Sequence, residues 1–183
     1  MRNKLNSTKK LVLTATFIAI GLVLPFLTMQ VPSIGNMLCP MHIPVLLCGF
    51  ICGGPYGLIA GLCLPVLRSV IFGAPVLMPT ALAMAFELAA YGFVSGILYD
   101  LVKNVKGGVY IALIGAMIIG RMVWGIAAFG LYHAVGNVFT WKIFATQAFV
   151  RAIPGIILQL LFIPLLVIQL EKAVSNEVIY ERK

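Results

Sequence analysis

Four ionisable side chains lie inside hydrophobic segments of this chain: Arg68, Glu87, Arg121 and Arg151. A charged side chain at the centre of a transmembrane helix costs at least ~2.5–3.5 kcal/mol, so such a residue is a functional candidate by default. A guanidinium binds a carboxylate through two parallel hydrogen bonds, and a buried carboxylate suits an amine. These residue types therefore indicate the binding of a small polar molecule.

The same residues do not indicate catalysis. A membrane-embedded enzyme would need a nucleophile, a metal cluster or paired carboxylates within reach of one another. Glu87 is the only carboxylate deep inside a span, and Asp100 lies about 20 Å away along the same helix. His42 and His133 lack a third metal ligand, and the cysteines form no Cys-x-x-Cys pair. We therefore expect no enzyme activity, no metal and no cofactor in this chain.

The composition predicts that membrane helices position these residues. The chain is 62% hydrophobic and 10% charged, whereas soluble domains are about 45–50% apolar and about 25% charged. Its mean hydropathy is +1.08. We expect an all-α integral membrane protein, with residues 1–183 forming a single membrane domain of six transmembrane helices. The approximate spans are Leu11–Met29, Met41–Gly53, Pro55–Gly73, Thr80–Val102, Gly108–Ala134 and Ile143–Leu170.

The second span is short for a membrane crossing. It could be tilted, partly re-entrant or shielded by the preceding loop.

The distribution of lysine and arginine predicts the orientation in the membrane. Basic residues gather in both terminal tails and in the connection after the fourth span, whereas only Lys142 lies on the opposite side. By the positive-inside rule, the N- and C-termini are cytoplasmic. The Gln30–Pro40, Ala74–Pro79 and Val135–Lys142 connections then face outward. The net charge is +8, but most of the basic residues lie at the ends of the predicted helices, and no run combines them with interleaved aromatic residues. We therefore expect no nucleic-acid partner.

The charged residues then all lie in the outer halves of their spans, roughly 8–20 Å below the outer surface at 1.5 Å per residue. This placement is typical of an outward-facing pocket, and helical spacing adds polar and aromatic neighbours to each charged residue. The candidate substrate-binding residues are Arg68, Glu87, Tyr91, Arg121, Trp124, Gln147, Arg151, Asn36 and His42.

Three alternatives, each a purely structural role, remain for these residues. Glu87 could pair with one or two arginines in a network that binds nothing, although one carboxylate cannot neutralise three guanidiniums. Arg68 lies near a helix end and could extend its head outward to the surface. Trp124 could be an interface anchor, as we expect for Trp141.

Three passages of the sequence are similar to motifs of a known family. The first span contains Ala15-Thr-Phe-Ile-Ala19, an Ala-x-x-x-Ala signature. The second and third spans contain His42-Ile-Pro-Val followed by Gly53-Gly-Pro-Tyr-Gly, and the fourth contains Pro79 to Gly92. In this order the passages resemble the substrate-binding S components of energy-coupling factor (ECF) vitamin transporters, and the resemblance covers nearly the whole chain.

The resemblance implies a mechanism and a location, the bacterial cell membrane. An S component of this kind captures a vitamin or related micronutrient with high affinity, under the Gln30–Pro40 and Ala74–Pro79 loops. It then docks through Ala15 and Ala19 onto a transmembrane T component, topples and releases its load inward. Two cytoplasmic ATPase subunits drive the cycle. This chain has no Gly-x-x-x-x-Gly-Lys-Ser/Thr phosphate loop, so the partners would use the ATP.

The residues leave the solute open between two classes. The surplus of arginine favours a carboxylate such as pantothenate or nicotinate, held by Arg121 and Arg151. Glu87 with Tyr91 and Trp124 would instead suit an amine-bearing heteroaromatic, such as a queuosine precursor, a pyrimidine or a pyridoxine-like compound. A non-transporting assembly subunit or a channel is a further alternative, but it leaves the one-sided placement of the charges unexplained.

Overall fold

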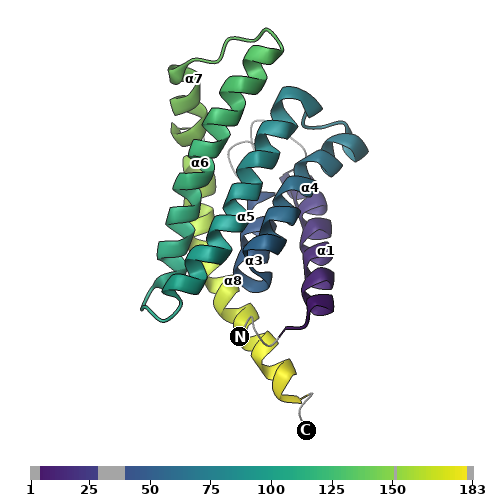
Figure 1. Ribbon diagram of the computed structural model, residues 1–183, viewed down its shortest axis with the longest axis vertical. Helices are drawn as coiled ribbons and strands as arrows, with labels where there is room; N and C mark the ends of the chain where they lie inside the picture. The colour runs from purple at the N-terminus through teal and green to yellow at the C-terminus, as the bar shows by residue number, and fades with distance from the viewer. Residues whose placement is uncertain (1–4, 29–39, 151, 181–183) are drawn as a thin grey trace.

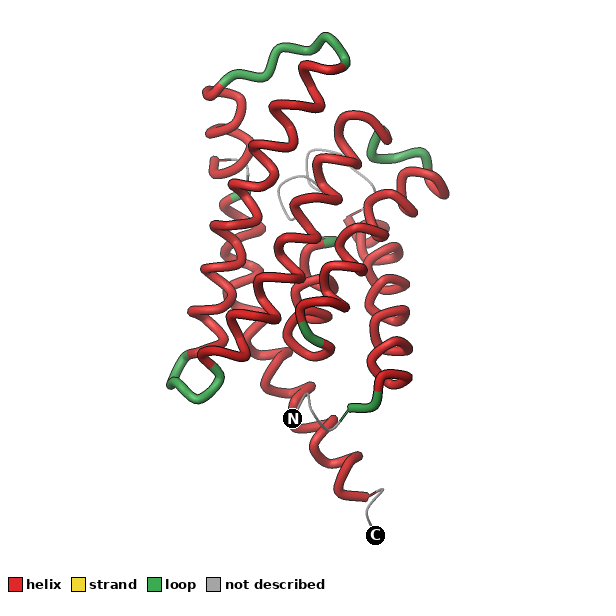
Figure 2. Tube along the Cα trace, in the orientation of Figure 1, coloured by secondary structure: helices red, strands yellow, loops and turns green. Residues whose placement is uncertain are grey.

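The computed structural model describes residues 5–28, 40–150 and 152–180, which form helices joined by short loops, with no strand among them (Figure 2). Within this described part of the chain, five helices are long and apolar enough to cross a membrane. The elements are α1 Ser7–Val23 with the 3-10 turn η2 Leu24–Thr28, α3 His42–Cys52, α4 Gly54–Phe72, the π turn η3 Leu77–Ala81, α5 Leu82–Val102, α6 Gly108–Ala134, α7 Trp141–Ala145, the π turn η4 Thr146–Val150 and α8 Ile153–Tyr180.

The two ends of the bundle differ in which segments they carry (Figure 1). The start of α1, the α5–α6 connection and the end of α8 lie at one end, and the α4–α5 and α6–α7 connections lie at the other. We call the second end the distal end. The lysine-rich segments thus share the end opposite to it, as the charge pattern predicts for the cytoplasmic side.

The short helix α3 lies in the middle of the bundle. It has 11 residues, so its length is about 16 Å, roughly half of the hydrocarbon core of a bilayer. Every residue of α3 except Ile43 is buried, and α1, α4, α5 and α8 pack around it. A backbone that does not span is tolerated where protein covers it. The second span is therefore shielded, and the described part of the shield consists of neighbouring helices.

Glycines allow the helices beside α3 to approach closely. A Cβ added at Gly57 would collide with the backbone of Gly92, and one at Gly92 would collide with the backbone of Gly57. One turn further along α4, Gly61 faces the backbone of Leu88 in the same way. Small residues provide such contacts in lipid, where the hydrophobic effect does not drive helices together. The α4–α5 pair therefore has a fixed, close-packed geometry.

The last predicted span needs a correction. One continuous helix over Ile143–Leu170 is wrong, because α7 ends at Ala145, the π turn η4 ends at Val150 and a new helix, α8, begins at Ile153. Pro154 is the second residue of α8, and proline has no N–H to donate to the carbonyl of Val150. The chain therefore starts a second helix there instead of continuing the first.

Candidate substrate-binding site

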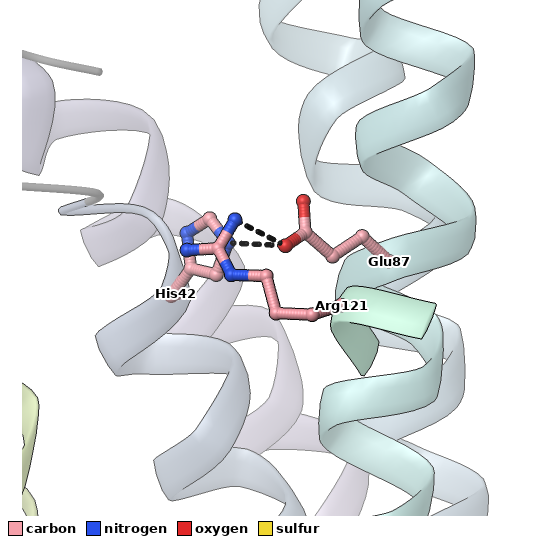
Figure 3. Close-up of polar contacts among 3 residues, drawn as sticks. All are labelled: His42, Glu87 and Arg121. Carbon is pink, nitrogen blue, oxygen red and sulfur yellow. Dashed lines mark ion pairs between the residues drawn. The ribbon is translucent and has the colours of Figure 1, made fainter. Parts of the chain in front are cut away.

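Three of the predicted residues meet in one buried cluster, which we call the Glu87 cluster (Figure 3). Arg121 Nη1 lies 2.8 Å from Glu87 Oε1, and His42 Nε2 lies 3.6 Å from the same oxygen. The residues come from three different helices, α6, α5 and α3. Their exposed fractions are only 2% for His42 and Glu87 and 8% for Arg121, so the ion pair is shielded from solvent by protein.

Local sequence features explain how the cluster is built. His42 is the first residue of α3, and the other two residues lie inside long helices. Tyr91, one turn from Glu87 and 1% exposed, packs its ring edge-to-face on His42, with 5.1 Å between the ring centres. A Cβ added at Gly120 would lie 3.1 Å from the Tyr91 ring, so the glycine next to Arg121 leaves room for that ring. Tyr91 therefore supports the cluster from the side.

The Glu87 cluster leaves the hydrogen-bonding atoms of His42 without partners. Glu87 and Arg121 neutralise each other, as a buried ion pair must to offset its desolvation. Neither ring nitrogen of His42 has a hydrogen-bond partner among the described residues, although both are buried. Buried polar atoms are nearly always hydrogen-bonded in folded proteins. A neutral imidazole offers one donor and one acceptor, so a bound polar molecule can satisfy both atoms.

Arg68 does not join the Glu87 cluster. Its Nη1 donates a hydrogen bond to the backbone carbonyl of Leu22, at 3.0 Å. Its guanidinium lies over the rings of Phe26 and Phe72, and the residue is only 6% exposed. The structure therefore separates Arg68 from Arg121, and it does not bear out extension of the Arg68 head to the surface.

Trp124 packs into an aromatic group at the distal end. Its ring stacks on Phe144, with 6.0 Å between centres and 23° between planes, and meets Phe139 edge-on at 5.8 Å. Trp124 is 8% exposed, whereas Trp141 is 79% exposed. Trp124 is thus an internal packing residue one turn from Arg121, and the exposure of Trp141 suits an interface anchor.

Three predicted binding residues remain: Gln147, Arg151 and Asn36. Gln147 is half-buried within η4. Arg151 and Asn36 fall outside the described residues, so their roles stay predictions.

The structure adds one residue that the predicted set omits. Gln159 on α8 is 1% exposed, and its Oε1 has no hydrogen-bond partner among the described residues. The sequence signal is an amide in the interior of the apolar run of residues 153–170, in which Gln169, near the end of the run, is the other amide. It is a second buried polar group that a ligand can satisfy.

A separate feature is the outer face of α1, the helix at the edge of the bundle (Figure 1). Ala15 and Ala19 are exposed, whereas Thr14, Phe17 and Gly21 are buried against the bundle. The α1 helix therefore turns its small-residue pair away from the rest of the described chain. Large exposed apolar residues flank the pair: Leu11, Val12, Ile20 and Val23.

Long apolar helices that surround a buried charged cluster are typical of a multi-pass membrane protein. A family model for the substrate-specific component of ECF transporters matches residues 9–180. The chain therefore belongs to this family and is the substrate-specific subunit of an ECF importer, a family of transporter subunits rather than of enzymes. No curated protein and no solved structure gives a match to it.

Proposed function

We propose that this protein captures a vitamin or related small micronutrient at the Glu87 cluster and delivers it to an ATP-driven importer. The observation that carries the proposal is the buried ion pair beside His42, whose ring nitrogens lack partners in the described part of the chain. A cluster that served only folding would have its polar atoms satisfied internally. The two ring nitrogens of His42 without hydrogen-bond partners are therefore best explained by a polar ligand that contacts this cluster.

For the solute, we propose a carboxylate-bearing compound, with pantothenate as the representative. Three arginines but only one glutamate lie inside the hydrophobic segments, and this surplus of positive charge favours an anionic ligand. A guanidinium binds a carboxylate through two parallel hydrogen bonds, and Arg121 is the expected anion-binding residue of the Glu87 cluster. Arg151 is the expected second anion-binding residue.

An amine-bearing heteroaromatic, such as a queuosine precursor or a pyridoxine-like compound, is the second candidate. The specific observation in its favour is that Arg121 is already paired with Glu87 and that Arg68 lies elsewhere. Both facts reduce the positive charge left for an anion. The rings of His42 and Tyr91 beside Glu87 then offer an aromatic wall next to a carboxylate.

We further propose that Ala15 and Ala19 dock on the T component, which two cytoplasmic ATPase subunits drive. The exposure of both alanines on the edge helix supports this role. Small side chains let two helix backbones approach closely in lipid.

The decisive experiment is purification in mild detergent, followed by mass spectrometry of any small molecule that co-purifies. A thermal-shift panel of pantothenate, nicotinate, pyridoxine and a pyrimidine then separates the two solute classes. We expect a bound compound and a shift with one class only. Repeated preparations that contain no small molecule and show no shift with any compound would favour a non-transporting assembly subunit.

A further inference from the structure

Arg68 belongs to a compact group of four residues at the distal end, apart from the Glu87 cluster. Its Nη1 donates to the carbonyl of Leu22 at 3.0 Å. The guanidinium lies 5.6 Å from the Phe26 ring centre and 5.5 Å from that of Phe72. The two rings meet edge-to-face at 5.0 Å. We call Arg68, Leu22, Phe26 and Phe72 the Arg68 clamp, because it joins the end of α1 and η2 to the end of α4.

The local sequence explains why these residues meet. Arg68 and Phe72 are four positions apart on α4, so they share one face of that helix. Leu22 is in the last turn of α1, and Phe26 follows it in the 3-10 turn η2. The residue three positions after Leu22 is Pro25, which has no N–H to donate to the Leu22 carbonyl within the 3-10 turn. That carbonyl, at the negative end of the helix dipole, is a suitable acceptor for a guanidinium. The contact therefore fixes the end of α1 on α4.

The α1 helix needs such a tie because it is less buried than the other long helices. In the apolar stretch of α1, 22% of the residues are buried, against 39% in the corresponding stretch of α4 and 56% in that of α5. At mid-helix Thr14 accepts a weak contact from Cys48 Sγ at 3.6 Å, and Gly21 packs against the side chain of Leu64. The helix that carries Ala15 and Ala19 is thus held on the bundle by a narrow strip and by the Arg68 clamp.

We propose that Arg68 is a positioning residue for docking: it sets the angle at which α1 presents Ala15 and Ala19 to the T component, and it does not contact the solute. This inference rests on the proposed docking role of α1. Removing the clamp lets α1 tilt among several arrangements, of which a fraction matches the partner. The apparent affinity for the partner is the intrinsic affinity multiplied by that fraction. The Glu87 cluster stays intact.

The test compares Arg68→Met with Leu67→Met, the neighbouring substitution on α4, where Leu67 is 40% exposed. Methionine approximates the length of arginine without its charge, and its unbranched, polarisable side chain can stay packed beside the aromatic rings of the clamp. Each variant is assayed for melting temperature, for retention of the co-purifying small molecule and for capture of the purified T component–ATPase module. We expect Arg68→Met to keep the first two and to lose about five- to tenfold in capture, as cation–π and hydrogen-bond energies suggest.

Rescue and coupling distinguish positioning from simple stability. Arg68→Lys keeps the cation and should recover part of the capture. Phe26→Leu should weaken capture in the wild type but add little in the Arg68→Met background, because both changes remove one clamp. If Arg68→Met captures the module like Leu67→Met, or if it also loses the small molecule and melts early, the inference is overturned. A wild-type protein that captures no module and retains no solute overturns the proposed function, and this inference with it.

Discussion

At the scale of single residues, the contrast between Glu87 and Arg68 carries the interpretation. Both are buried. Glu87 Oε1 pairs with Arg121 and lies near His42, whereas the Arg68 guanidinium donates to a backbone carbonyl and lies over two aromatic rings. This contrast is why we propose a positioning role for Arg68 and a binding role for the Glu87 cluster, whose histidine lacks hydrogen-bond partners in the described part of the chain.

The first prediction separates the structural and the binding roles of the ion pair. Glu87→Ala leaves the Arg121 guanidinium without its carboxylate, and we expect a loss of about 3–5 kcal/mol in stability, seen as earlier thermal unfolding. The double variant Glu87→Leu/Arg121→Met should recover folding and still retain no small molecule. Asp100→Asn is the control, because Asp100 pairs with Lys103 at a half-exposed site and should change stability by less than about 1 kcal/mol. Solute retention by the double variant would show that the ion pair does not bind the solute.

The second prediction concerns Arg151, whose binding role rests on the sequence. Arg151→Ala should abolish retention of the small molecule, because a carboxylate would lose its second guanidinium partner. Folding, followed by thermal melting, should stay intact. Unchanged retention would remove Arg151 from the site and strengthen the amine-bearing alternative.

At the scale of elements, the α4–α5 contact determines where Glu87 lies. Gly57 and Gly92 bring the two backbones together, and α3 packs against both helices. His42 at the start of α3 therefore meets Glu87 on α5 at a defined distance. The glycine contacts position the site although none of these glycines contributes a polar group.

The third prediction tests this contact. Gly57→Val would force side-chain atoms into the backbone of Gly92, so we expect a stability loss of at least about 1–3 kcal/mol, as for overpacked cores. Solute retention should fall with it, because the spacing between α3 and α5 changes. Gly130→Ala on α6 is the control, since a Cβ there would meet nothing within 4 Å and alanine favours a helix. If Gly57→Val melts like Gly130→Ala, the close contact does not exist in the membrane.

At the scale of the whole molecule, the proposed capture site and the proposed docking face lie on different parts of the chain. The Glu87 cluster is buried between α3, α5 and α6, whereas Ala15 and Ala19 lie on the outer face of α1. A subunit that moves as a body needs this separation, because the partner must bind it without blocking the solute.

The fourth prediction follows from that separation. Ala15→Trp should leave solute retention unchanged and reduce uptake by whole cells to the background level, because the indole prevents close helix contact. Ile126→Trp on α6 is the matched control, since Ile126 is 75% exposed and far along the chain from the α1 face. Normal uptake with Ala15→Trp would show that the docking assignment is wrong.

The sequence by itself determined the class of the fold and most candidate residues. A mean hydropathy of +1.08 and long apolar runs are sufficient for a multi-pass helical membrane protein, because hydrocarbon tolerates few other structures. Glu87 and Arg121 were identifiable for the same reason: a charge inside an apolar helix is costly and therefore conspicuous. The alanine pair of α1 and the glycine pairs were also visible as spacing.

Only the tertiary structure decided which residues meet. Helical spacing gives the face of one helix but not the rotation or tilt of its neighbour, so it could not separate Arg68 from Arg121 or join His42 to Glu87. The break before α8 falls next to Pro154, whereas Pro164 lies inside α8, so residue types alone do not tell at which proline a helix stops. Side-chain chemistry is local and can be recognised in a sequence, whereas contact between helices depends on packing across the whole bundle.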